Sequence, residues 1–373
     1  MSLAKETVRR AENEEQLTKH SPDKKDKTVK PKWGYVFKRS FNEFLADGCT
    51  DLAAALTYFA VLSIFPALLA VVSLLGVFGQ GQQTTQAILE LISGFAPQDV
   101  LTLVKDPITQ LTTSSAAGLA LITGILGALW TASGYVGAFG RALNKIYDVV
   151  EGRPLIKLRL WNLLVTAILV LIVVVMVAVL ILSGGVVNMI SGAIPGVDLS
   201  GFATIWNWLR WPIALVLAIV LIALLYYGTP NVKQPKLRWI SPGAAFSLVG
   251  MAVAALGFTF YVSNFGNYNA TYGTIGGVIV LLLFIWIMNN VLLFGAQIDS
   301  EIERSRELKA GIPAEESVQL PPRSEVQAQK MIDTREKLVE EARDIRLEHS
   351  GLDYSEDNGS GEGSLAGSTK APK

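Results

Sequence analysis

The chain has 373 residues, of which 51% are hydrophobic and only 17% are charged, and its 32 basic residues balance 32 acidic ones. The hydrophobic residues form long uninterrupted runs, which excludes an ordinary water-soluble domain and indicates a membrane protein. With two histidines and one cysteine, the chain offers neither a disulfide framework nor the three gathered ligands of a catalytic zinc site.

Six apolar runs are each long enough to cross a bilayer, which takes about 20 residues. Each run is expected to be a helix, because backbone donors and acceptors in hydrocarbon must pair within their own segment. We therefore predict an all-α, polytopic membrane bundle of six transmembrane helices. The six spans cover residues 52–78, 116–139, 160–182, 206–227, 239–262 and 275–294.

Lysine and arginine alternate between many and few in the segments outside these spans. From the amino to the carboxyl end the segments carry 11, 1, 5, 0, 3, 0 and 11 of them. The positive-inside rule then places both termini in the cytoplasm, as an even number of spans requires. No cleavable signal peptide is expected, since the first fifty residues lack an apolar core.

The two ends lie outside the membrane domain, which we place at residues 32–303. Residues 1–31 are charged and residues 350–373 are rich in Gly and Ser, so both are expected to be disordered cytoplasmic arms. Residues 304–349 form a charged cytoplasmic tail. Within it, residues 324–349 combine good helix formers with opposite charges, which predicts a solvated helix.

The first span begins with Asp47 and Asp51, one turn apart, where the helix dipole favours acidic groups. Pro66 lies in mid-span and is expected to kink the helix, because it lacks an N–H group. Both features have a structural explanation. A kinked helix with Tyr58 on a face of small residues is also typical of helices that line a cavity.

The connection of residues 79–115, which follows the first span, has apolar residues at helical spacing. It predicts two short amphipathic helices on the outer side of the membrane. They either cap the bundle or lie on the bilayer, and capping is favoured because the basic face of a surface-seeking helix is missing.

The connection "GRALNKIYDVVEGRP", residues 140–154, lies on the predicted inner face. Arg141, Asn144 and Lys145 are expected to share a polar helical face turned away from Tyr147. They could act as a positive-inside anchor. Alternatively, Arg141 pairs with one of the aspartates that begin the first span, or binds a phosphate headgroup.

The outer connection "SNFGNYNATYGTIGG", residues 263–277, is free of charge but rich in Asn, Tyr and Gly. The fifth helix is expected to continue past residue 262 and to break at Gly273, Gly276 and Gly277. An aromatic belt with a Gly-rich turn would explain the tyrosines. Our hypothesis is that the loop gates a cavity between spans one, five and six and recognises an uncharged or zwitterionic compound. Its candidate residues are Asn264, Asn267, Tyr268, Tyr272 and Gly273.

Two amides and one guanidinium lie at membrane depth. Asn289 and Asn290 interrupt the sixth apolar run, where they either form hydrogen bonds between helices or line a pathway. Arg210 lies among tryptophans near the outer end of the fourth span and is expected to snorkel to the headgroups. Contact with a substrate anion is the alternative for Arg210.

Four stretches, in this order and within this six-span layout, resemble the BrkB-like virulence-factor family, which was formerly mislabelled ribonuclease BN. They are "DLAAALTYFAVLSIFPALLAVVSLLG", "RALNKIYDVVEGRP", "PNVKQPKLRWISPGA" and "YVSNFGNYNATYGTIGGVIVLLLFIWI". The resemblance covers residues 32–303. It implies a bacterial cytoplasmic-membrane protein of six helices with a role in transport or envelope resistance, and it implies no catalytic residue.

We expect a non-enzymatic protein that transports or handles a lipid or small solute and supports envelope integrity or resistance. The alternative is an envelope scaffold that transports nothing. A membrane ribonuclease has the least support, because the sequence offers neither a metal-ligand cluster nor a basic groove with stacking aromatics. The expected partners are membrane lipids and an unknown lipid or small solute, without nucleic acid, cofactor or metal. A homo-oligomer is compatible with this composition.

Overall fold

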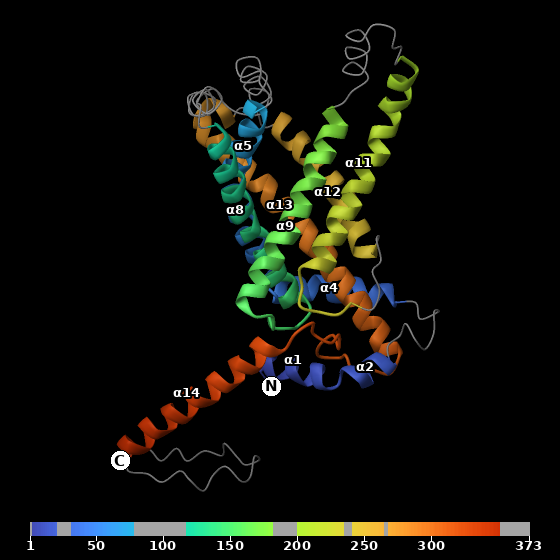
Figure 1. Ribbon diagram of the computed structural model, residues 1–373. Coiled ribbons are helices and arrows are strands. Elements are labelled where there is room, and N and C mark those ends of the chain that lie inside the picture. Colours follow the sequence, from blue (N-terminus) through green and yellow to red (C-terminus); the bar gives the residue numbers. More distant parts are fainter. Residues whose placement is uncertain are drawn as a thin grey trace, which may run out of the picture.

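The computed structural model describes residues 2–20, 31–77, 117–181, 200–234, 241–264 and 268–350. Within these ranges the regular structure is helical, and one isolated antiparallel bridge joins Val232 to Pro322. Figure 1 shows a bundle of long helices, with α1, α2 and α14 at one end, which we call the base. The helices are α1 (Leu3–Glu12), α2 (Glu14–His20), α4 (Trp33–Ala46), α5 (Cys49–Val77), α8 (Ala117–Ile146), α9 (Leu155–Ile181), α11 (Ser200–Gly228), α12 (Pro242–Asn264), α13 (Tyr268–Lys309) and α14 (Val326–Ser350).

The six apolar runs coincide with α5, α8, α9, α11, α12 and α13. Their outward surfaces carry large apolar side chains such as Ile156, Trp208 and Leu256, which suit lipid tails better than water. Among the described residues, four helices are long and apolar enough to cross a membrane, or five if the bent pair α4–α5 forms one span. The all-α membrane bundle is therefore confirmed, while the count of six spans stays a prediction.

The centre of the bundle is aromatic. Phe139 of α8 stacks on Tyr135 of the same helix and on Tyr226 of α11, with ring centroids 6.3 and 6.2 Å apart. Leu56 of α5 and Leu293 of α13 are fully buried in the same core. Four helices thus meet around one ladder of rings, whose burial is a large part of what holds them together.

The close approach of α12 and α13 depends on two glycines. A Cβ atom on Gly243 would collide with the carbonyl oxygen of Gly295, and one on Gly295 would collide with the Ser247 side chain. Since lipid tails remove the hydrophobic force between membrane helices, close backbone packing of this kind is a main source of their association.

Helix α4 precedes α5 and is bent from it by 65°. Gly48 makes the turn at φ 61°, a left-handed conformation that favours glycine. One side of α4 packs on the bundle through buried Val36 and Phe44. The neighbouring stripe of α4 is apolar but exposed, and it consists of Trp33, Phe37, Phe41 and Leu45.

The amino-terminal residues differ from the disorder expected for residues 1–31. Helices α1 and α2 are regular, and Ser2 caps α1 by accepting a hydrogen bond from the Lys5 backbone N–H at 3.4 Å. Arg10 of α1 is 1% exposed beneath the bundle. The composition of this segment is typical of a disordered arm, but its charges find partners on other segments. Residues 21–30 lie outside the described residues.

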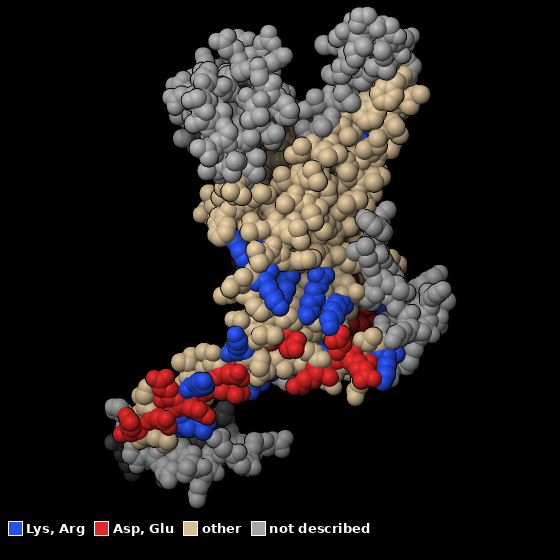
Figure 2. Space-filling view, in the orientation of Figure 1, with Lys and Arg blue, Asp and Glu red and all other residues tan. Residues whose placement is uncertain are grey.

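The charged carboxyl-terminal tail divides into two parts. Helix α14 confirms the predicted solvated helix, and Figure 1 shows it leaving the bundle while Figure 2 shows both signs of charge on it. Before it, α13 continues to Lys309, and buried Ala314 and Val318 then pack against the base. Residue 303 is therefore not the end of the packed body. The arm at residues 351–373 lies outside the described residues.

The junction of α12 and α13 differs from expectation. Helix α12 ends at Asn264, and α13 begins at Tyr268 and runs through Gly273, Gly276 and Gly277. The predicted break at these glycines is wrong, because glycine is well tolerated in membrane helices, where it allows close packing. The two amphipathic helices predicted in residues 79–115 lie outside the described residues.

Candidate functional site

A polar layer crosses the interior of the bundle, formed by Thr57 of α5, Tyr135 of α8 and Asn289 of α13. The Asn289 amide donates to the Thr57 hydroxyl at 3.2 Å, and the Tyr135 hydroxyl donates to the Asn289 carbonyl oxygen at 2.8 Å. Thr57 also donates to the Ala53 carbonyl at 2.8 Å. Thr57 and Asn289 are buried away from water, so these hydrogen bonds satisfy polar groups that would otherwise be costly to bury. The layer joins three helices through side chains alone.

The two asparagines of α13 have different environments. Asn289 is 3% exposed and bonds to two other helices, whereas the Asn290 amide donates to the Trp286 carbonyl of its own helix at 2.8 Å. The prediction of hydrogen bonding between helices therefore holds for Asn289. It does not hold for Asn290, which turns back along α13.

A second buried group of polar side chains lies on the other side of Phe139. A hydrogen bond of 2.7 Å joins the Tyr226 and Ser247 hydroxyls, and Tyr226 also donates to the Leu292 carbonyl. Near the start of α12, the Asp299 carboxylate accepts from the Ser241 hydroxyl and, at 2.8 Å, from a backbone N–H. A carboxylate at this place is stabilised by the dipole of α12.

An inner-loop cluster ties three connections together at the base, through Asn144, Glu151, Arg153, Asn231 and Ser324. The Asn144 amide donates to Glu151 at 3.0 Å and its carbonyl oxygen accepts from the Asn231 backbone N–H at 2.6 Å. Arg153 pairs with Glu151 at 2.7 Å, and the Asn231 amide donates to the Ser324 carbonyl at 2.8 Å. Asn144 is 4% exposed. The expected polar face shared by Arg141, Asn144 and Lys145 is therefore wrong, because Asn144 points inward.

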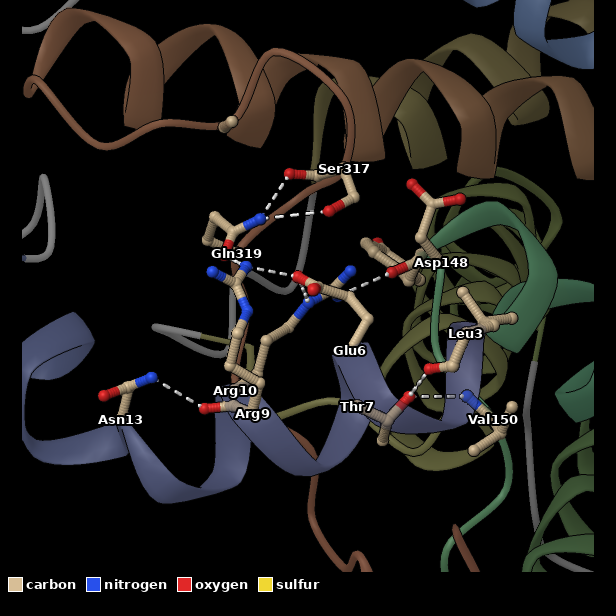
Figure 3. Close-up of polar contacts among 12 residues, drawn as sticks. Leu3, Glu6, Thr7, Arg9, Arg10, Asn13, Asp148, Val150, Ser317 and Gln319 are labelled. Atoms are coloured by element: carbon tan, nitrogen blue, oxygen red, sulfur yellow. Dashed lines mark hydrogen bonds and ion pairs between the residues drawn. The ribbon is translucent and has the colours of Figure 1, made fainter. Parts of the chain in front are cut away.

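Charged side chains of distant segments meet beneath this cluster, as Figure 3 shows around α1. Arg10 donates to Glu6 at 3.3 Å and to the Tyr147 carbonyl at 3.2 Å, and Arg304 of α13 pairs with Asp148 at 3.2 Å. Burial lowers the pKa of Arg10 and raises the pKa of Asp148, although both groups lie near charges of opposite sign. Tyr147, a candidate from the sequence, is thus a buried contact for α1.

The aspartates and Arg141 near the start of α5 do not pair. The Arg141 guanidinium lies 6.0 Å from the Phe59 ring centroid, and among the described residues no ion pair or hydrogen bond reaches it. Asp51 is exposed, and the Asp47 carbonyl accepts a hydrogen bond from Lys145. Burial raises the pKa of Asp47 to about 6, and the nearby Asp148 adds to the shift. The proposed pairing of Arg141 with either aspartate is wrong.

The remaining candidates do not converge on one site. Tyr58 is 61% exposed and its ring contacts Phe59 edge-on at 5.4 Å, so it faces outward instead of lining a cavity. Arg210 lies 5.5 Å from the Trp211 ring centroid and donates to the Leu180 carbonyl of α9 at 3.4 Å, so it contacts a neighbouring helix, and its expected snorkelling to the headgroups stays a prediction. Other candidate side chains lie outside the described residues, and they are Pro66, Asn264, Asn267, Tyr268, Tyr272 and Gly273.

Several residues of these sites carry no sequence signal that points to a site. Tyr135, Tyr226 and Ser247 look like ordinary members of apolar runs, and only the packing of four helices shows that their hydroxyls meet partners. Asp299 is a partial exception, because a carboxylate shortly after the sixth apolar run is expected to have a polar partner. Among the described residues, no group of three or more His, Cys, Asp or Glu side chains could hold a metal ion.

Comparison with known proteins places this arrangement in a family. The family model described as virulence factor BrkB matches residues 40–319. The ribonuclease-like protein YfkH of Bacillus subtilis is 32% identical over 271 residues, which are 73% of this chain and 96% of that protein. A UPF0761 membrane protein of Acinetobacter baylyi is 28% identical over 68% of this chain, and another of Nitrosospira multiformis is 27% identical over 70%.

The match covers 59% of the length of each of these two UPF0761 relatives, which are therefore longer than the matched region. No protein of solved structure matches the chain. The family model extends from α4 to the segment that follows α13, and the match to the Bacillus relative covers 73% of the chain. The chain therefore belongs to the virulence factor BrkB family of membrane proteins.

Proposed function

We propose that this protein transports or handles a lipid or small solute in the cytoplasmic membrane of a bacterium and thereby supports the envelope. The observation that carries the proposal is the polar layer of Thr57, Tyr135 and Asn289 between membrane helices, in which Thr57 and Asn289 are buried. Polar side chains are costly at this depth, and such groups commonly mark pathways in membrane proteins. The proposal assigns the chain no enzymatic activity.

The layer has spare hydrogen-bonding capacity. The Asn289 amide has a second N–H, and the carbonyl oxygen has a second lone pair, beyond the bonds to Thr57 and Tyr135. A polar compound that entered the bundle could therefore bind Asn289 without breaking both helix contacts. The stacked rings of Phe139 and Tyr226 continue from Tyr135 toward the base, so aromatic and hydroxyl groups follow one another along the interior.

An envelope scaffold is the second candidate, because α14 projects from the base and its residues 333–348 are exposed. A charged helix in this position suits a contact with another protein. The scaffold hypothesis expects deletion of residues 326–373 to abolish function, whereas transport expects the bundle to suffice. The ribonuclease-like name belongs to the Bacillus relative, and we do not propose that activity for this chain.

The test uses purified protein in liposomes. Movement of acyl-labelled NBD-phosphatidylcholine between leaflets is followed by dithionite quenching, and passage of small neutral solutes is followed by osmotic swelling. We expect protein-dependent movement of at least one of these probes above that of empty liposomes. Failure of every probe, in protein that is folded and inserted, would count against transport and leave the scaffold as the better account.

A further inference from the structure

A small donor-lined site lies where α8 meets α9, over Gly137. A Cβ atom on this glycine would be 3.1 Å from the Asn162 side-chain nitrogen of α9 and 3.6 Å from a terminal nitrogen of Arg141. The missing side chain thus leaves room between two hydrogen-bond donors. We call these three residues the Gly137 cradle.

The donors of the cradle lack acceptors in the protein. Among the described residues, no hydrogen bond or ion pair reaches the Arg141 guanidinium or the Asn162 side-chain amide. Asn162 is 6% exposed as a residue, and its amide nitrogen keeps some access to the surface. An external acceptor placed just above Gly137 would accept hydrogen bonds from both donors.

The charge of the cradle favours an anion. The Phe59 ring lies 6.0 Å from the Arg141 guanidinium and favours the cation without neutralising its charge. Arginine presents a planar fork of N–H donors that matches the oxygens of a phosphate. The cradle therefore combines a fixed positive charge, a neutral donor and a space of limited size.

The surroundings favour a lipid as the source of that anion. Arg141 is exposed near the end of α8 that faces the base, and the nearby Tyr58 is 61% exposed on an otherwise apolar surface. Figure 2 shows Lys and Arg side chains gathered at the boundary between the uncharged body and the charged base, where headgroups of that leaflet would lie.

We propose that the Gly137 cradle binds the phosphate of an anionic phospholipid in the leaflet on the side of the base, with Arg141 and Asn162 as donors. Binding here does not depend on transport, so the cradle and the polar layer can be tested separately. A lipid held at this place would join α8 to α9 at the surface where the inner-loop cluster begins.

The test is native mass spectrometry of the full chain with added palmitoyl-oleoyl phosphatidylglycerol. We expect R141Q to weaken lipid binding about tenfold or more, since a charge-assisted bidentate contact is lost. G137A should also weaken it, because the new methyl group occupies the space between the donors. R141K should bind less well than wild type, as a point charge replaces the fork.

The matched control is K157Q, which removes one exposed positive charge near the start of α9 outside the cradle. It should change binding less than about twofold, since a single exposed cation contributes weakly. Equal loss in K157Q and R141Q would overturn the proposal, because it would show attraction by general charge. Unchanged binding in both G137A and R141Q, each verified as folded by gel filtration, would overturn it as well.

Inorganic phosphate serves as the second probe and distinguishes a phospholipid headgroup from a free phosphate ion as the ligand. We expect phosphatidylglycerol to remain bound in the presence of excess inorganic phosphate, because its acyl chains contact the apolar surface. Inorganic phosphate could instead displace the lipid with an affinity similar to that of phosphatidylglycerol, and R141Q could abolish phosphate binding. In that case the cradle recognises a soluble phosphate, and the lipid assignment is wrong.

Discussion

Neighbouring side chains of the same type have different roles in this bundle. Asn289 bonds to α5 and α8, whereas Asn290 bonds to its own helix. Arg9 and Arg10 differ in the same way, with side chains 46% and 0% exposed. The sequence shows that a polar residue lies at membrane depth, but the rotation of a helix about its axis decides which partner it finds. In a uniformly apolar helix little in the sequence reveals that rotation.

Asp47 gives a pH-dependent prediction at the residue scale. Its pKa is raised from 3.8 to about 6 by burial and by Asp148, so the folded state favours the protonated carboxyl group. The stability that protonation contributes is complete below about pH 4 and is lost as the pH rises through 6. Because the group is only partly buried, solvent screening limits the effect to about 1 kcal/mol.

The variant Asp47→Asn keeps this position neutral at every pH. We expect it to melt at a higher temperature than wild type at neutral pH, and the difference to shrink as the pH is lowered through 6. Thermal unfolding in detergent across this range measures it, with Asp51→Asn as the control because Asp51 is exposed. A difference that is constant with pH, or one that grows toward acid, would contradict the assigned environment of Asp47.

At the scale of elements, α4 has an apolar stripe that is present in the sequence but hard to recognise there. Trp33, Phe37, Phe41 and Leu45 recur every four residues and form one stripe, yet charged residues between them hide the pattern from a search for apolar runs. The bend of 65° from α5 allows α4 to lie along the membrane surface. We predict that its exposed stripe lies among the lipid headgroups and acyl chains.

Spin labels at two adjacent positions test this placement. With Cys49 replaced by Ala, a label at Phe41 should be accessible to oxygen, which dissolves in lipid, and a label at Asn42 should be accessible to a water-soluble nickel chelate. The positions differ by one residue but face opposite environments if α4 is interfacial. Equal accessibility of both labels to the nickel chelate would show that α4 lies in water.

The docking of α1 is a second prediction at this scale. Arg10 is buried with bonds to Glu6 and to the Tyr147 carbonyl, so Arg10→Ala removes the donor to this carbonyl and leaves a cavity under the bundle. We expect α1 to dock more weakly by about 2–4 kcal/mol. Hydrogen exchange of residues 3–12 measures the change as faster exchange. The control Arg9→Ala, at a half-exposed side chain, should have a much smaller effect, and equal effects would contradict the structure.

For the whole molecule, much of the architecture follows from the sequence. Each of the six apolar runs coincides with a helix, because length and hydropathy are properties of single segments, although α13 extends well beyond the sixth run at its carboxyl end. The packing of α1 and of residues 312–320 under the bundle could not be read in this way. Buried Arg10 and Arg304 acquire their partners only when distant segments fold together, and their charge alone predicts solvent exposure.

Membrane topology is a prediction for the whole molecule. The alternation of Lys and Arg among the connections predicts cytoplasmic termini. A reporter that fluoresces only in the cytoplasm should therefore be bright when fused after Lys373 and dark when inserted after Pro195. A dark carboxyl-terminal fusion that is expressed at normal levels would rule out the arrangement of six spans.

The most direct test of the proposed function replaces the polar layer by apolar groups of similar shape. The triple variant Thr57→Val, Tyr135→Phe and Asn289→Leu removes donors and acceptors together, so its melting temperature should stay close to that of wild type. The control Asn290→Leu changes an amide outside the layer. The measurement is the protein-dependent rate of probe movement in liposomes. We predict that the folded triple variant loses this movement about tenfold or more while Asn290→Leu retains it. Wild-type movement in the triple variant would show that the layer serves only to pack the helices.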